Sequence, residues 1–181
     1  MRAGRLALGL VVIGAALLPS IVQAQPNDLI EAALRAATRS FTRALPQLDA
    51  VSMGVRSAEY GAALRQRQFR SSLSGSMLDV RVEIAGSERG LCAGYAAYVT
   101  PAIAQNAMIL TICPRFFSPG ADGLRETTIL HEMVHVVAGP DECRAMAYTA
   151  QIQLLSSGGF TPVDAYWARN NCAASAYRLP R

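Results

Sequence analysis

The most informative segment of the sequence is Thr128–His135, which reads TILHEMVH. It contains the only two histidines of the chain, His131 and His135, four residues apart with Glu132 between them. Residues i and i+4 lie on the same face of an α-helix, so both imidazoles can reach one ion while Glu132 holds a water beside it. The segment therefore predicts a metal-binding helix. The alternative is two histidines that pack in the interior or face solvent.

Zinc suits two imidazoles and a carboxylate, and a catalytic site leaves a fourth position for a water whose pKa falls toward ~7. In this interpretation Glu132 is the general base that takes a proton from the water attacking a peptide carbonyl. Asp141 and Glu142 both follow the break at Gly139-Pro140 and are candidates for the third ligand. Each also has a structural explanation, because Asp is a good helix N-cap and acidic residues are favoured in a first turn.

Hydrophobic periodicity outward from this helix predicts an α+β domain, with a small antiparallel sheet packed with helices. Apolar residues recur every three to four positions in an amphipathic segment, Asn27–Leu45, and a weaker helix follows whose basic face we expect to be solvated. Strict alternation then predicts strands. The expected helices are Asn27–Leu45, Ala58–Leu73, Leu124–Val137, Asp141–Leu155 and Pro162–Ala174, and the expected strands are Leu78–Ile84, Tyr95–Val99 and Ala107–Cys113.

Asp164 has two interpretations. The run Thr161-Pro162-Val163-Asp164 fits a capping box with Pro at the first helical position, which would explain this acid structurally. It is also a candidate for a functional carboxylate. Whether the segment Gln25–Leu45 packs in the domain or masks a cleft as a propeptide stays open at this level.

The first 24 residues are typical of a secretory signal peptide. Arg2 and Arg5 precede an apolar run from Leu6 to Leu18, and Val22-Gln23-Ala24 supplies the small residues that signal peptidase needs. The run is shorter than the ~20 residues of a membrane span, although an uncleaved anchor is the competing interpretation. We therefore expect a chain exported to the periplasm or the exterior, with one domain at residues 25–181.

Composition supports a packed domain and gives little evidence for polyanionic partners. Of the 181 residues 51% are hydrophobic and 17% are charged, which excludes disordered and collagen-like chains. All 17 basic residues are Arg, set against 13 acidic residues for a net charge of +4. After signal cleavage the excess is too small and too scattered to predict binding to nucleic acid or to an anionic membrane. We expect a monomer with no stable membrane association.

The four cysteines predict two disulfides, because exported chains usually pair their thiols. Three pairings are possible, and sequence order favours Cys92 with Cys113 and Cys143 with Cys172. A cysteine-rich metal site is the alternative, but the chain has no C-x-x-C pair.

Over about Tyr60 to Asn171 the chain resembles the aspzincin metallopeptidases, the family of deuterolysin and the peptidyl-Lys metalloendopeptidases. The resemblance includes a Cys, a Tyr-rich strand, an apolar strand ending in Cys, an aromatic pair and T-x-x-H-E-x-x-H. Here these features are Cys92, Tyr95–Val99, Ile109–Cys113, Phe116-Phe117 and Thr128–His135. The resemblance implies a zincin-like fold, and it separately implies the Cys92–Cys113 disulfide.

The resemblance also implies roles for particular residues. The family's third zinc ligand is an Asp, and counting back from Ala150-Gln151 places Glu142 at that position. The family's oxyanion-assisting Tyr would fall at Ala145, so that role would pass to Tyr148 or Tyr166. Asp164 matches an Asp of the family's N-A-D-x-Y segment and is the candidate substrate-binding acid. The further acid of Lys-selective members would fall at Trp167, which argues against lysine specificity.

Together these observations predict a secreted or periplasmic zinc endopeptidase that acts on proteins or peptides. The metal ligands would be His131, His135 and Glu142, and the catalytic residues Glu132 with Tyr148 or Tyr166. Two other classes of protein remain as alternatives: a zinc-stabilised binding module that has lost turnover, and a metal-free exported structural protein.

Overall fold

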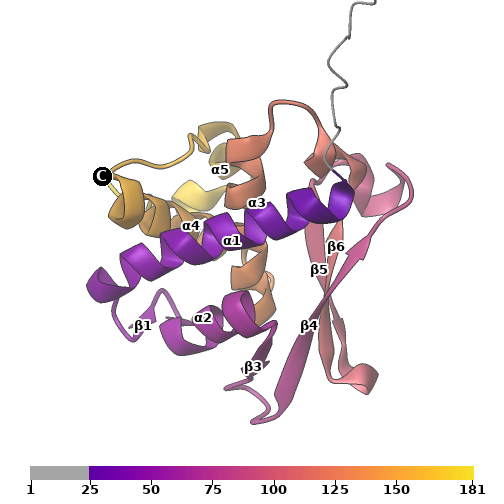
Figure 1. Ribbon diagram of the computed structural model, residues 1–181. Helices are drawn as coiled ribbons and strands as arrows, with labels where there is room; N and C mark the ends of the chain where they lie inside the picture. Colours follow the sequence, from indigo (N-terminus) through magenta and orange to yellow (C-terminus); the bar gives the residue numbers. More distant parts are fainter. Residues whose placement is uncertain (1–24) are drawn as a thin grey trace, which may run out of the picture.

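Helices lie to one side of a four-stranded sheet in the computed structural model, which describes residues 25–181 (Figure 1). The predicted signal peptide, residues 1–24, lies outside the described residues. The architecture is mixed α+β, as the sequence predicts. The helices are α1 (Pro26–Ala44), α2 (Ser57–Gln66), α3 (Asp122–Ala138), α4 (Glu142–Ser157) and α5 (Asp164–Arg169), and the strands are β1 (Val51–Ser52), β2 (Val55–Arg56), β3 (Gln68–Arg70), β4 (Met77–Ile84), β5 (Ala97–Ala102) and β6 (Ala107–Ile112).

The four-stranded sheet has the order β3-β4-β6-β5 and is mixed. β3 pairs with β4, and β5 with β6, in antiparallel fashion, but β4 and β6 are parallel, with Asp79 opposite Ala107 and Ile84 opposite Ile112. The expectation of an antiparallel sheet is therefore wrong at its centre. The reason is that the β5–β6 hairpin turns back and places β6 between β4 and β5. β6 is accordingly the most buried strand, and β5 forms an edge.

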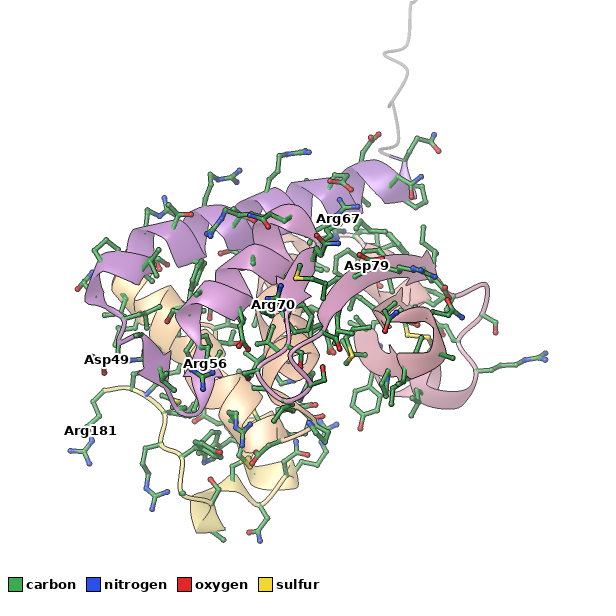
Figure 2. All side chains as sticks on the ribbon, turned by 90° about the horizontal axis from the view of Figure 1, so that it is seen from below. Asp49, Arg56, Arg67, Arg70, Asp79 and Arg181 are labelled. Carbon is green, nitrogen blue, oxygen red and sulfur yellow. A yellow bond between two sulfur atoms is a disulfide. The ribbon has the colours of Figure 1, made fainter. Side chains whose placement is uncertain are left out.

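Two predicted helices are too long. α2 ends at Gln66 instead of Leu73, because Arg67 adopts a left-handed conformation (φ 51°) and the next residues pair with β4 as β3. The three basic side chains of this region, Arg65, Arg67 and Arg70, are exposed, as expected for a solvated face; Figure 2 shows Arg67 and Arg70 at the surface.

α5 spans only Asp164–Arg169, not Pro162–Ala174, and no side chain caps its start. Its N-cap position is Val163, so the predicted capping box is wrong. The short β1–β2 hairpin has no counterpart among the predicted strands.

α1 forms part of the main hydrophobic core. Its apolar face is buried with α3 and α4, and Ala37 and Phe41 are completely inaccessible. The Phe41 ring lies 5.0 Å from that of Tyr60 on α2. The segment Gln25–Leu45 is thus packed into the domain, which answers the question that its sequence leaves open.

Both disulfides have the predicted partners, Cys92–Cys113 and Cys143–Cys172. The first joins Cys92, in the helical turn before β5, to Cys113, which directly follows β6. The second joins the first turn of α4 to the segment after α5, and so holds the C-terminal region against α4. In residues 25–181 no helix is both long and apolar enough to cross a membrane.

Candidate metal centre

One face of α3 packs in the core, and the opposite face, which carries the two histidines, lines a cleft. Leu130, Met133 and Val134 are completely buried. The start of the helix is anchored by Arg125, whose Nε donates to the Phe116 carbonyl at 2.8 Å, with a second guanidinium nitrogen donating to the Ser118 carbonyl at 2.8 Å. These contacts fix the helix on which His131, Glu132 and His135 are presented.

A tight corner brings α4 back over the end of α3. Gly139 has φ +88° and ψ −174°, a conformation that is essentially restricted to glycine. Asp141 is the N-cap of α4, and its Oδ1 accepts from the Arg144 backbone N–H at 3.0 Å. An Arg144 guanidinium nitrogen donates to the Ala138 carbonyl at 2.5 Å and so ties the two helices together. The corner places Glu142 in the first turn of α4, beside the histidines.

His131, His135 and Glu142 converge as a triad of possible ligands. Glu142 Oε2 lies 2.9 Å from His131 Nε2 and 3.4 Å from His135 Nε2. The two Nε2 atoms are 3.0 Å apart. The triad is therefore a group of one carboxylate and two imidazoles that can hold a metal ion. Asp141, the other candidate for the third ligand, acts as the helix cap instead.

Two imidazole nitrogens and a carboxylate oxygen that lie this close together can coordinate one metal ion. Ligands about 2.0–2.2 Å from a tetrahedral ion lie about 3.3–3.6 Å apart; the 3.4 Å separation lies in this range, and the separations of 2.9 and 3.0 Å are shorter. His135 Nδ1 lies 2.9 Å from the Gly139 carbonyl, and that contact fixes the tautomer in which Nε2 is free to act as a ligand. A backbone carbonyl that orients a ligand histidine in this way is a common feature of metal sites.

The protonation of the triad follows from its mutual contacts. Burial works against the charge of Glu142, but hydrogen bonds from His131 and His135 outweigh it and hold the pKa of the carboxyl well below its usual value. Burial lowers the pKa of His131. For His135, burial is outweighed by the contacts with Glu142 and the Gly139 carbonyl, which raise its pKa. The site thus favours an ionised Glu142 carboxylate beside a positively charged His135. A divalent metal ion would supply positive charge at the same place.

Glu132 lies beside the triad and outside it. Its side chain is largely buried, and burial raises the pKa of its carboxyl to about 8; the nearby charge of His135 opposes this shift, and that of Glu142 adds to it. Glu132 lines both cavities that flank the triad. A carboxylate with a raised pKa next to a possible metal site is suited to accept a proton.

The two tyrosine candidates have different environments. Tyr166 on α5 donates its hydroxyl to Glu142 Oε2 at 3.0 Å, and its ring lies 6.0 Å from that of His131. Burial raises the pKa of Tyr166, so this hydroxyl keeps its proton at neutral pH. Tyr148 is completely buried, its ring packs edge-on 5.2 Å from Tyr60, and it lines neither cavity. The structure brings Tyr166 to the triad and does not bring Tyr148.

Asp164 does not join the site either. It is exposed at the first residue of α5, and it is not among the residues that line the two cavities. The neighbouring residues Ala165 and Tyr166 do line a cavity, so the helix turns the Asp164 side chain elsewhere. The prediction that Asp164 binds substrate thus has no support from its position.

Two cavities of about 340 and 400 Å³ adjoin the triad and share Tyr95, Ala97 and Glu132. The first, which we call the His131 cavity, is bounded by α3, α4 and the segment Thr161–Arg169. The second, the His135 cavity, is bounded by the edge strand β5 and the α3–α4 corner. Both volumes are in the range of small-molecule sites. A cleft therefore extends on both sides of Glu132.

The sequence interpretation missed three residues of this region. Tyr95 lies where the two cavities meet, Arg169 lines the His131 cavity, and Arg144 stabilises the corner. Tyr95 lay in a predicted strand, but no pattern in the sequence distinguishes a cleft-facing aromatic residue from one in the core. Arg169 and Arg144 belong to helices whose neighbours only the tertiary structure defines.

Comparison of the chain with protein-family models, curated proteins and solved structures gives no match.

Proposed function

We propose that the protein is a zinc-dependent endopeptidase. The observation that carries the proposal is the convergence of His131, His135 and Glu142 within ligand distance of one another, with Glu132 beside them. Two imidazoles and a carboxylate with an open fourth position form the ligand set of catalytic zinc in peptidases. A bound zinc ion would polarise the substrate carbonyl and lower the pKa of a water.

Glu132 performs the proton transfers in this proposal. Its carboxylate takes a proton from the attacking water and later delivers it to the nitrogen of the leaving amine. Tyr166 supports the site by donating its one hydroxyl proton to Glu142 Oε2, and the same hydroxyl would have to turn away from Glu142 to donate to the oxygen on which negative charge develops. Tyr148 has no part in this scheme because its hydroxyl is buried in the core.

The substrate is a protein or peptide in extended form beside β5. This strand ends the sheet, so its outer edge offers backbone groups to an added strand. Ala97, Tyr98 and Val99 of β5 line the His135 cavity, and Ala97 also borders the His131 cavity. A chain running along β5 would pass Glu132, with side chains on either side of the scissile bond entering the two cavities.

The fold around the site is zincin-like in this proposal, and the protein acts outside the cytoplasm. The presence of two disulfides supports an oxidising compartment. We expect a monomer with a protein or peptide substrate and no nucleic-acid partner.

The test is cleavage of an unfolded protein by the zinc-loaded chain, followed by gel and mass spectrometry. Wild type should cleave it, a chelator should stop cleavage, and added zinc should restore it. Glu132→Gln should retain zinc, but its rate of cleavage should fall at least 10³-fold. A loss of this size is expected when a general base is removed together with its electrostatic effect. Glu88→Gln, an exposed acid outside the site, is the matched control. If wild type and Glu132→Gln are equally inert while both bind zinc, the protein is a zinc-stabilised binding module.

One observation favours that second function. Ala145 occupies the position of the tyrosine in the resembled family and is completely buried, so any oxyanion donor must come from another element. Tyr166 is the residue nearest the triad that could supply it, and the turnover of Tyr166→Phe relative to wild type tests whether it does.

A further inference from the structure

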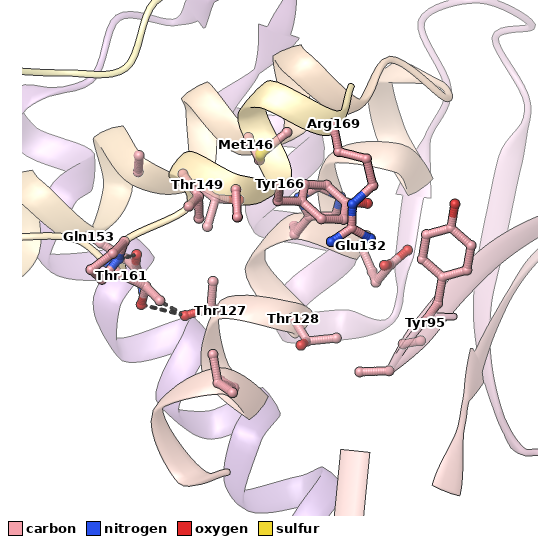
Figure 3. A pocket seen from close by; sticks show the side chains of 18 of the residues that line it. Tyr95, Thr127, Thr128, Glu132, Met146, Thr149, Gln153, Thr161, Tyr166 and Arg169 are labelled. Atoms are coloured by element: carbon pink, nitrogen blue, oxygen red, sulfur yellow. Dashed lines mark hydrogen bonds between the residues drawn. The ribbon is translucent and has the colours of Figure 1, made fainter. Parts of the chain in front are cut away.

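We infer that the His131 cavity selects the residue next to the scissile bond, and that it accepts an apolar side chain of the size of Leu, Met or Phe and rejects Lys and Arg. The inference rests on the proposed peptidase function. It concerns the lining of the cavity, which differs in charge and polarity between its two ends (Figure 3).

The walls of the cavity are mostly apolar. They include Leu124 on α3, Met146 and Ala150 on α4, and Pro162 and Val163 before α5. Leu124 is 58% exposed and Tyr95 is 41% exposed, and both border this cavity. Large apolar side chains left in water at the rim of a concave site are typical of surfaces that a ligand covers.

The end of the cavity away from Glu132 is polar but uncharged. Gln153 donates to Thr127 Oγ1 at 2.9 Å and to Thr161 Oγ1 at 3.2 Å, and its Oε1 accepts from the Thr161 backbone N–H at 3.0 Å. The two threonine hydroxyls also bond to each other at 2.9 Å. These groups therefore satisfy one another, and none of them carries the negative charge that a buried ammonium or guanidinium needs.

Among residues 25–181, Arg169 is the only Arg or Lys that lines the cavity. It lies over the Tyr166 ring at 5.5 Å, and Figure 3 shows it near the end occupied by Glu132 and Tyr95. None of the ion pairs between residues 25 and 181 involves Arg169. A basic substrate side chain would pass this unpaired positive charge on its way into the cavity. It would meet no carboxylate beyond it, because Glu132 is the one acidic residue among residues 25–181 that line the cavity.

Two measurements test the inference on zinc-loaded protein. The first is the affinity of short peptide hydroxamates that differ only in having Leu, Glu or Lys beside the zinc-binding group. The second is the cleavage profile of a peptide library. Leu should bind at least tenfold more tightly than Lys, and cleavage should follow the same order. Arg169→Glu should reduce the Leu-to-Lys ratio at least fivefold, with Arg169→Gln intermediate. Arg39→Glu, on the exposed face of α1, should leave the ratio unchanged.

The outcomes separate the inference from the function on which it rests. A Lys hydroxamate that binds as well as the Leu one, or a ratio that Arg169→Glu leaves unchanged, overturns the specificity. Hydroxamates that bind with the expected order to a protein that cleaves nothing would overturn the peptidase function and leave the pocket assignment standing. If no hydroxamate binds at all, both are wrong.

Discussion

Asp141 and Glu142 are adjacent acids with different roles. The Asp141 carboxylate caps α4, whereas the Glu142 carboxylate faces the histidines. A cap contributes about 0.5–2 kcal/mol to stability, and a ligand contributes mainly to metal affinity. Variants of these two adjacent residues can therefore serve as controls for each other.

We predict that Asp141→Ala changes mainly the stability of the fold and that Glu142→Gln changes mainly the affinity for zinc. Asp141→Ala should lower the free energy of unfolding by about 1 kcal/mol because the Arg144 N–H loses its acceptor, and it should leave zinc affinity within threefold. Glu142→Gln should weaken zinc binding at least 100-fold. Urea unfolding and competition titration with a zinc indicator measure the two quantities. Equal zinc affinity in both variants would contradict the assignment of the third ligand.

Tyr166→Phe removes the hydroxyl that donates to Glu142. Loss of such an outer partner typically lowers metal affinity 10- to 100-fold. We expect about a tenfold loss of zinc affinity and a further fall in kcat at saturating zinc, because the donor for the developing oxyanion is also gone. Steady-state kinetics at several zinc concentrations separates the two effects. Unchanged kcat at saturating zinc would show that Tyr166 only positions the ligand.

At the residue scale the sequence predicted the two histidines of the triad and the glutamate beside it. His131, Glu132 and His135 follow from the spacing of a helix, and the structure confirms that both rings reach one carboxylate. The choice between Asp141 and Glu142 depended on the angle of the corner, which the sequence alone does not determine. Asp164 and Tyr148 do not line the cleft, because their positions depend on where α5 begins and how α4 rotates in the core, so their proposed roles remain predictions.

At the scale of elements, the α3–α4 corner is the feature that assembles the triad. Gly139 occupies a backbone conformation restricted to glycine, and its carbonyl contacts His135 Nδ1. Gly139→Ala should cost about 1–3 kcal/mol of stability and weaken zinc binding, since the corner must shift. Gly86→Ala, at a glycine with ordinary φ and open space around it, is the control. Thermal unfolding with and without zinc gives both values, and identical behaviour of the two variants would contradict this role.

The Cys143–Cys172 disulfide ties the start of α4 to the segment that follows α5. It closes a span of 29 residues, for which chain entropy predicts a contribution of about 3–4 kcal/mol. Replacing both cysteines by Ser should lower stability by that order and also weaken zinc binding, because Tyr166 loses its support. The matching Cys92/Cys113 double variant should lose stability with little change in zinc affinity. Equal losses of zinc affinity in both would argue against a specific role for the C-terminal tether.

The sequence predicted β4 well and the sheet topology poorly. Alternation identifies a strand with one buried face, as in β4, but it does not reveal which strands are neighbours or their direction. The parallel β4–β6 pair arises because β6 lies between β4 and β5. In the same way, β3 was missed because a left-handed residue at Arg67 ends α2 early, and no glycine marks that position.

At the scale of the whole molecule, the core, the sheet and the disulfides support the cleft. We expect the peptidase activity proposed for this cleft to change with pH in one direction. Burial raises the pKa of Glu132 to about 8 from an ordinary value of 4.5, and a bound cation would lower it again. Glu132 acts as a base only when deprotonated, so kcat/KM should fall as pH drops through a pKa between these limits. Activity that rises from pH 8 to pH 5 at constant zinc occupancy would contradict the assignment.

Metal analysis after gel filtration measures whether His131, His135 and Glu142 hold one zinc ion. Purified residues 25–181, loaded with zinc and freed of excess, should retain one equivalent, and X-ray absorption should show nitrogen and oxygen ligands at about 2.0–2.1 Å. His131→Ala should retain less than a tenth of an equivalent. Wild-type protein with less than a tenth of an equivalent, or a His131→Ala variant that binds as much zinc as wild type, would show that these three residues do not form a zinc site.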